Sequence, residues 1–335
     1  MPGFPIYVVD SFTEQTFAGN PAAVCLLDEI LPNDELQKIA AEFNLSETAY
    51  PLPVDRSLRG PDRWKTCQRF SLRWFTPTKE VKLCGHATLA TAHVLFNEHG
   101  NLNDKLSFET LSGELIVSRK RTEGGHKSSE DSKWLIMDFP AYDILHVKTS
   151  RVRSNEEIVS LFEQIEDQND IASKIADELV GPGKWLHLAI APDSRKLLVV
   201  IDPKFTKSEF EAIHPATDRL LAIDPNGEFV TGTVLTLAPS DPYRQGYPKT
   251  AEGREVDYVS RYFAPFYGIP EDPATGSAQC ALAPFWTKKL GRTSCYALQC
   301  FPGRGASFLV DVKTQTRRVE ISGAAVTVIR GTITL

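Results

Sequence analysis

Cysteines are few in this sequence, and their spacing matches neither a disulfide framework nor a zinc finger. Six cysteines are scattered over 335 residues, and no two of them form a Cys-x-x-Cys pair. Disulfide-rich domains and structural zinc sites both depend on closely spaced cysteines. We therefore expect no metal, and reduced thiols of the kind found in the cytosol.

Long apolar runs are also absent. No stretch approaches the ~18 residues that a bilayer-spanning helix needs. The first apolar run, Ile6 to Val9, ends at Asp10, and no basic segment precedes it. A secretory signal combines a basic start with a longer apolar region. We therefore expect a cytoplasmic protein that is neither secreted nor embedded in a membrane.

The chain lacks an excess of positive charge. Lys and Arg total 37 against 43 Asp and Glu, which gives a formal net charge of −6. A broad nucleic-acid surface needs a basic excess, so nucleic acid is not an expected partner. The hydrophobic share of 42% and the charged share of 24% are ordinary for a globular protein. The length predicts about two domains.

The common cofactor motifs are missing. The sequence has no Walker loop, no Rossmann Gly-x-Gly-x-x-Gly, no His-Glu-x-x-His and no Gly-x-Ser-x-Gly elbow. A nucleotide cofactor or a catalytic metal is therefore unsupported, and we expect no cofactor.

What the sequence does contain is a repeat. Arg73-Trp74-Phe75-Thr76-Pro77 returns as Arg261-Tyr262-Phe263-Ala264-Pro265, and each copy precedes a small-residue turn, at 84–87 and at 275–278. The repeat predicts two related domains, 1–145 and 146–335, with a last strand that could pack back on the first domain. A site between them would be lined by two helix N-termini, which bind anions readily.

An apolar stretch follows each turn. His86 to Phe96 and Ala278 to Trp286 are apolar or small almost all round, which is typical of a buried helix. Pro284 is expected to bend the second helix or delay its regular start. Two short buried helices among many predicted strands favour an α+β fold with sheets wrapped around central helices. The polar stretch Gly124 to Lys133 is expected to be a hairpin loop.

The two turns supply the first candidate site residues. Gly85 and Gly276 permit close backbone approach to a ligand. The N–H groups of Gly85, His86, Gly276 and Ser277 would be unpaired at helix starts and available to a carboxylate. An ordinary helix start explains each turn alone, but the matched positions in a repeat favour a functional role.

Four side chains are candidates for a catalytic role, three of them near these turns and one elsewhere in the sequence. His86 titrates near neutral pH and can carry a proton. Asp272 either caps the second helix or takes part in the reaction. Cys84 lies at a helix start, where thiol pKa values fall, but its counterpart is Thr275, so a two-thiol epimerase lacks its second thiol. Glu47 looks by pattern like a surface residue.

Several longer blocks together resemble one known family. They are Asp10 to Phe12, Phe17 to Val24, Asn44 to Ala49, Arg73 to Pro77 with Glu80, Leu83 to Ala90, and Glu271 to Ala278. The sequence resembles the PhzF-like family nearly end to end, and in particular the animal-type phenazine biosynthesis-like domain proteins. The resemblance implies a diaminopimelate epimerase-like fold, with two similar domains that each wrap a β-barrel-like sheet around a central helix.

The resemblance also implies an activity. It indicates an isomerase without metal or organic cofactor that moves a proton on a small unsaturated or enolisable carboxylic acid, and it indicates a homodimer. The family's general acid/base glutamate matches Glu47, and its pocket histidine and aspartate match His86 and Asp272. Its backbone anion donors match Gly85, His86, Gly276 and Ser277. The phenazine enzymes usually have a small residue at Cys84, so phenazine precursors are not the expected substrates.

Two other functions stay open. A Cys84-dependent dehydratase or racemase of an imino or amino acid would use Thr275 in place of a second thiol, as related proline racemase-like dehydratases do. A non-catalytic interaction or ligand-sensing role on the same fold is the other alternative, because a fold does not fix a function.

Overall fold

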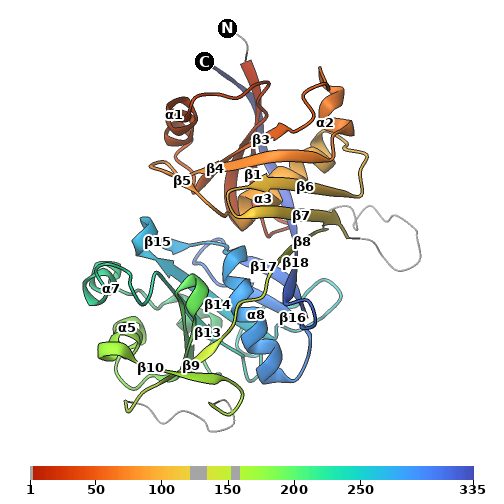
Figure 1. Cartoon of the computed structure of the whole chain (residues 1–335). Helices are drawn as coiled ribbons and strands as arrows, with labels where there is room; N and C mark the ends of the chain where they lie inside the picture. The colour runs from red at the N-terminus through yellow and green to blue at the C-terminus, as the bar shows by residue number, and fades with distance from the viewer. Residues whose placement is uncertain (1–2, 121–133, 152–158) are drawn as a thin grey trace. The chain divides into compact units, whose positions relative to one another are not determined.

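The computed structural model describes residues 3–120, 134–151 and 159–335. The predicted hairpin loop at 124–133 lies outside them. The chain divides into two compact units, which we describe separately (Figure 1). Unit 1 consists of Met1–Phe139 and Glu320–Leu335, and unit 2 of Pro140–Val319. No helix of the described residues has the length and apolar character needed to cross a bilayer.

Unit 1 is a closed ring of strands. Its order is β1, β2, β3, β4, β6, β7, β8 and β18, and β18 pairs back with β1. The strands are β1 (Gly3–Ser11), β2 (Asn20–Cys25), β3 (Glu47–Pro53), β4 (Arg69–Phe75), β6 (Lys105–Thr110), β7 (Gly113–Arg119), β8 (Trp134–Pro140) and β18 (Arg318–Thr334). The short β5 (Glu80–Val81) pairs with the end of β4. Among the described residues, the ring from β1 to β18 is therefore closed, and only the short β5 lies outside it.

Unit 2 repeats this order. From β11 to β17 its neighbours run antiparallel, parallel, antiparallel, parallel and antiparallel, as they do from β1 to β7. The strands are β9 (Leu145–Lys148), β10 (Glu163–Glu166), β11 (Trp185–Ala191), β12 (Lys196–Ile201), β13 (Gly232–Leu237), β14 (Tyr258–Ala264), β15 (Ile269–Asp272), β16 (Ser294–Gln299) and β17 (Ala306–Lys313). The prediction of two similar barrel-like domains is confirmed.

One helix fills each sheet. In unit 1, α3 (Gly85–His93) is buried at every residue and packs against β1, β2 and β3. It continues as a π-helix, η1 (Val94–Glu98). In unit 2, α8 (Gly276–Leu290) packs against β12, β16 and β17. Both helices are surrounded because their sequences offer no polar face, and this confirms the α+β fold with central helices.

Pro284 lies inside α8 without ending it. Proline has no N–H, so it cannot bond the carbonyl of Cys280 four residues earlier. That carbonyl instead accepts the backbone N–H of Tyr142 at 2.9 Å. The Cys280 carbonyl that proline leaves free therefore links the first residues of unit 2 to its central helix.

The repeated pentapeptide has a structural reason. Arg73 on β4 donates from Nε and Nη2 to the two carboxylate oxygens of Glu80 on β5, at 2.7 and 2.8 Å. Arg261 on β14 makes the same paired contact with Glu271 on β15, at 2.7 and 2.8 Å. Paired contacts of this kind are the strongest and most directional ion pairs. They hold the polar loop in place ahead of each central helix.

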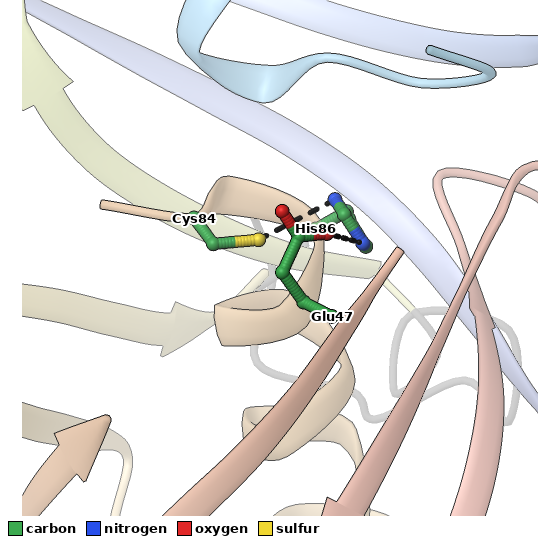
Figure 2. Close-up of side chains that lie close together, drawn as sticks. All are labelled: Glu47, Cys84 and His86. Carbon is green, nitrogen blue, oxygen red and sulfur yellow. Dashed lines mark hydrogen bonds and ion pairs between the residues drawn. The ribbon is translucent and has the colours of Figure 1, made fainter. Parts of the chain in front are cut away.

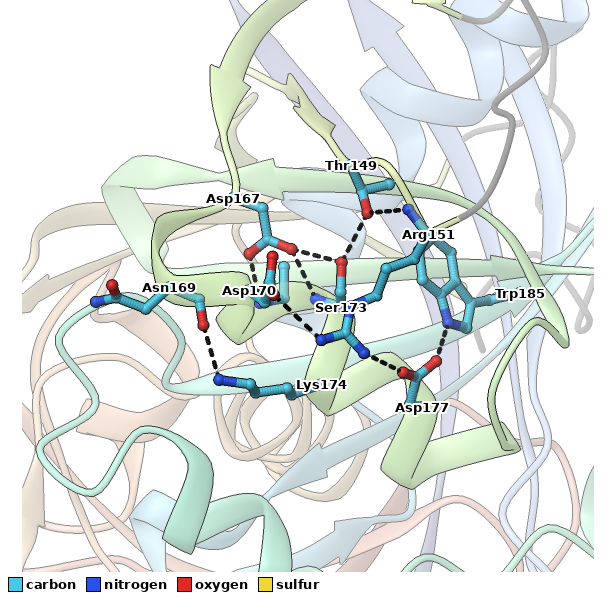
Figure 3. A network of polar contacts seen from close by, with 10 residues as sticks. Thr149, Arg151, Asp167, Asn169, Asp170, Ser173, Lys174, Asp177 and Trp185 are labelled. Atoms are coloured by element: carbon cyan, nitrogen blue, oxygen red, sulfur yellow. Dashed lines mark hydrogen bonds and ion pairs between the residues drawn. The ribbon is translucent and has the colours of Figure 1, made fainter.

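The remaining helices lie outside the sheets. They are α1 (Asn33–Phe43), α2 (Asp62–Thr66), α5 (Ile171–Val180), α6 (Lys207–Glu211) and α7 (Thr217–Ile223), with 3₁₀ turns η3 (Gln168–Asp170), η4 (Pro192–Ser194) and η5 (Pro265–Tyr267). Figure 3 shows what begins α5: the Asp167 carboxylate accepts the N–H groups of Ala172 and Ser173, at 2.8 and 3.0 Å. Arg151 then joins Asp170 to Asp177 across the same helix.

Candidate functional site

Glu47 is the first residue of β3 and is only 7% exposed. The pattern-based expectation of a surface glutamate is therefore wrong. Its carboxylate reaches the first turn of α3, where Oε2 lies 3.1 Å from Nε2 of His86 (Figure 2). Both side chains come from segments that the sheet brings together, since β3 and β2 each pack against α3.

The His86 ring is oriented from its other side. Nδ2 of Asn20 lies 3.2 Å from Nδ1 of His86. The hydroxyl of Ser46 donates to Oδ1 of Asn20 at 3.3 Å, which directs the amide nitrogen toward the ring. Because an amide N–H can only donate, Nδ1 is the acceptor when the ring is neutral, and the proton of the neutral ring is then on Nε2. The proton of neutral His86 therefore faces Glu47.

The facing atoms of this pair have unused hydrogen-bonding capacity. Glu47 Oε2 and His86 Nε2 are both buried, and neither makes a well-directed hydrogen bond within the protein. Their separation is an ion-pair distance, but the alignment of a hydrogen bond is missing. Buried polar atoms without a directed partner are rare in native structures. These two atoms therefore keep hydrogen-bonding capacity that the protein itself does not use.

The charges around His86 favour its protonated form. Burial acts to lower the pKa of His86, but its interactions with Cys84 and, after it, with Glu47 outweigh burial and raise that pKa well above its ordinary value. The protonated ring can donate a proton or a hydrogen bond.

Cys84 precedes α3 and is buried beside His86, with Sγ 3.5 Å from Nδ1. Burial, and after it the charge of Glu47, raise the pKa of the Cys84 thiol to about 11. The expectation that the helix start lowers this pKa is wrong, because desolvation outweighs the helix dipole here. The thiol stays protonated at neutral pH, which argues against Cys84 as a resident base.

The same three side chains are the candidate metal ligands. One ligand atom from each of Glu47, Cys84 and His86 lies within 4.8 Å of the other two. The Cys84 sulfur faces Nδ1 while the Glu47 carboxylate faces Nε2. One ion cannot occupy both sides of the imidazole, and the raised thiol pKa opposes the thiolate that zinc requires. The arrangement suits proton transfer better than a resident metal.

In unit 2, Asp272 is the last residue of β15 and is buried. Its Oδ2 accepts the hydroxyl of Thr275, the residue before α8. Gln299 locks the turn: Oε1 accepts the Thr275 N–H at 2.8 Å, and Nε2 donates to the Asp272 carbonyl at 2.5 Å. Asp272 thus shapes the helix start. No pattern in the sequence singled out Gln299 or, for His86, Asn20 as a positioning residue.

Gly85 and Gly276 are the first residues of α3 and α8 and are both buried. Neither belongs to the glycines with positive φ among the described residues. Left-handed backbone is therefore not the reason for glycine at either position. The first N–H groups of each helix, which include those of His86 and Ser277, have no acceptor inside the helix.

A family model described as phenazine biosynthesis-like protein matches residues 9–215 and 238–331. The matched ranges include every candidate site residue named above. The chain belongs to the phenazine biosynthesis-like family. Its similarity to curated members extends over nearly the whole length: it is 39% identical to the human phenazine biosynthesis-like domain-containing protein over 98% of this chain and 99% of that one. The cattle protein of the same name is 38% identical over the same shares.

Bacterial relatives extend the phenazine biosynthesis-like family further. An uncharacterized isomerase of Halalkalibacterium halodurans is 35% identical over 99% of this chain and 98% of that one. The crystal structure of a PhzF-family protein from Enterococcus faecalis superposes with a TM-score of 0.73 at 31% identity, over 100% of both chains. A predicted epimerase of Pseudomonas aeruginosa, 17% identical with a TM-score of 0.62, shares the fold. The paired-barrel fold of this family is thus established.

Proposed function

We propose that this protein is a cofactor-independent isomerase that moves a proton on a small unsaturated or enolisable carboxylic acid, with Glu47 as general acid/base. The observation that carries the proposal is the buried Glu47–His86 pair, whose facing atoms lack directed hydrogen bonds. The names of bacterial relatives as isomerases support the reaction class.

The proposed chemistry is a proton transfer between two carbons of the acid. The Glu47 carboxylate takes a proton from a carbon next to the unsaturated system, so the C–H bond breaks and an O–H bond forms. The electron pair spreads into the conjugated acid. Return of the proton to another carbon moves the double bond, and Nε2–H of His86 can donate to the developing negative charge. Nothing is oxidised or reduced, so the reaction requires no redox cofactor. General acid–base catalysis of this kind contributes about 10²–10⁴-fold.

Backbone N–H groups hold the acid. In unit 1 we assign carboxylate binding to the first N–H groups of α3, at Gly85 and His86. In unit 2 we assign the same role, considered by itself, to the first N–H groups of α8, at Gly276 and Ser277. Helix starts of this kind stabilise an anion and the charge that develops on it. Asp272 is assigned as a second acid/base group beside the α8 start. We also propose that the protein is a homodimer and that it is cytoplasmic. The homodimer rests on the family resemblance, and the compartment rests on composition.

Deuterium incorporation tests the proposal. The purified chain is incubated in deuterated water with a panel of small unsaturated carboxylic acids, and each acid is followed by NMR. We expect at least one acid to acquire deuterium at a carbon. Glu47→Gln should slow that exchange by about hundredfold or more and leave binding of the acid largely intact. Glu42→Gln, an exposed glutamate of α1, is the matched control. Exchange at the normal rate in Glu47→Gln would overturn the assignment.

A further inference from the structure

Lys196 is the first residue of β12 and is only 8% exposed. Among the hydrogen bonds and ion pairs of residues 3–120, 134–151 and 159–335, none pairs its ammonium with a carboxylate. Its Nζ instead lies 5.9 Å from the ring centroids of both Tyr142 and Tyr262. Aromatic rings solvate a cation only in part, and a buried cation without an anion is costly. Lys196 therefore has capacity for an anionic partner.

The position of Lys196 in the repeat is informative. Lys196 pairs with Gly232 between β12 and β13, and in unit 1 the same ladder position pairs Ala22 with Glu47. Unit 1 thus has an acid where unit 2 has glycine, and unit 2 has a lysine where unit 1 has alanine. The acid of unit 1 belongs to the proposed proton-transfer pair. The lysine of unit 2 occupies the neighbouring strand at the same end of its own barrel.

The residues beside Lys196 are connected to the start of α8. Tyr262 pairs across the sheet with Asp272, the residue that shapes that start. Cys280 lies one turn into α8, and its carbonyl accepts the backbone N–H of Tyr142, whose ring is one of the two beside Lys196. Lys196 therefore lies near the first turn of α8, which carries the Gly276 and Ser277 N–H groups.

We propose that Lys196, between Tyr142 and Tyr262, binds a second carboxylate of the ligand, so that short dicarboxylic acids are the ligand class of unit 2. This inference rests on the proposed function for the first carboxylate, which the α8 start holds. Burial lowers the pKa of Lys196, and a bound carboxylate would favour its charged form again.

Binding measurements by calorimetry test the proposal on the full chain, with succinate and butyrate as probes of equal carbon number. We expect succinate to bind at least about tenfold more tightly than butyrate, because only succinate pairs with the buried ammonium. Lys196→Met should remove this preference and leave butyrate binding unchanged. Lys204→Met, an exposed lysine of the same unit, should keep the preference. An unchanged ratio in Lys196→Met, or no preference in the natural chain, overturns the proposal.

A second measurement covers the case in which Lys196→Met fails to fold. Carbon NMR of the natural chain with isotope-labelled lysine should show that succinate shifts the Cε resonance of Lys196 and butyrate does not. Equal shifts with both acids contradict the proposal. Glu47→Gln separates this inference from the isomerase assignment, because it should retain the succinate preference while losing deuterium exchange. If the succinate preference persists but no exchange occurs in the natural chain, the binding site stands and the isomerase proposal fails.

Discussion

Glu47 and Gly232 occupy equivalent positions in the two barrels. The residues that follow them, Thr48 and Thr233, pair with Phe75 and Phe263 of the repeated pentapeptide. A Cβ at Gly232 would lie 2.3 Å from the hydroxyl oxygen of Tyr262. Tyr262 thus occupies the space in unit 2 that a side chain such as Glu47 uses in unit 1. The two units share the same strand pairing, but only unit 1 carries the proposed proton-transfer glutamate.

The space around Gly232 gives the first prediction. Gly232→Ala should destabilise the protein by about 1–3 kcal/mol, because the tyrosine ring must shift to admit the methyl group. Urea unfolding measures the change. Tyr262→Phe combined with Gly232→Ala should recover part of the loss, because the nearest clashing atom is gone. Gly331→Ala is the control, since its Cβ would make an ordinary contact at 3.4 Å with Ile6. Equal effects at both glycines would contradict this account.

The Asn20 amide is predicted to set the proton position on His86 whenever the ring is neutral. Asn20→Leu keeps the approximate shape but removes the donor, so Nδ1 of the neutral ring can keep the proton that should face Glu47. We expect a fall of about tenfold to hundredfold in the exchange rate, with little change in ligand affinity. Nitrogen NMR of the imidazole should report the altered tautomer. Ser46→Ala, which frees the amide to rotate, should act in the same direction but less strongly. A rate loss without a tautomer change would assign Asn20 a purely structural role.

Cys84 is predicted to be dispensable for proton transfer. The pKa of its thiol is raised to about 11 by burial and by Glu47, so the thiolate is scarce at neutral pH. Cys84→Ala should keep exchange within a few fold of the natural rate, and iodoacetamide should modify this thiol slowly at pH 7. If Cys84→Ala abolished activity while Glu47→Gln kept it, the dehydratase or racemase alternative would replace the proposed function.

A stacked histidine pair predicts acid sensitivity in unit 2. His146 and His187 lie 4.6 Å apart between ring centroids, and both nitrogens of His187 are buried without hydrogen bonds. Burial, and after it the positive charges of His146 and Lys289, lower the pKa of His187 to about 3. An unfolded histidine titrates near ~6.5. The neutral ring therefore stabilises the fold fully above that value, and this stability is lost as the pH falls from ~6.5 toward 3.

Denaturation as a function of pH measures this loss. The free energy of unfolding should fall by about 1.4 kcal/mol per pH unit below pH 6 from this one group. His187→Phe should flatten the dependence, because phenylalanine packs beside Phe285 without titrating. His214→Gln, an exposed histidine, should leave it unchanged. A slope that survives His187→Phe would mean that other groups cause it.

Local patterns in the sequence determined much of this fold. The pentapeptide repeat, the small-residue turns and the two stretches without a polar face predicted two related domains with sheets around buried helices, because strand and helix periodicity are properties of short segments. The barrel form was implied only by the family resemblance. Helix ends were less well defined: α8 extends to Leu290, beyond the predicted Trp286, because Pro284 is accommodated by the Tyr142 contact. Elements without strong periodicity, such as β9 and β10, were not predicted.

The chemistry of the candidate site was decided by tertiary structure. His86 and the two glycines stood out because they sit on the turns, but nothing near Glu47 in the sequence marked it as buried, and only family resemblance selected it. Its contact with His86, the Asn20 amide behind the ring and the buried Lys196 between two tyrosines all depend on strand pairing and helix packing between distant segments. Local residue patterns specify strands and helices, whereas the environment of a charge depends on which of those elements pack around it.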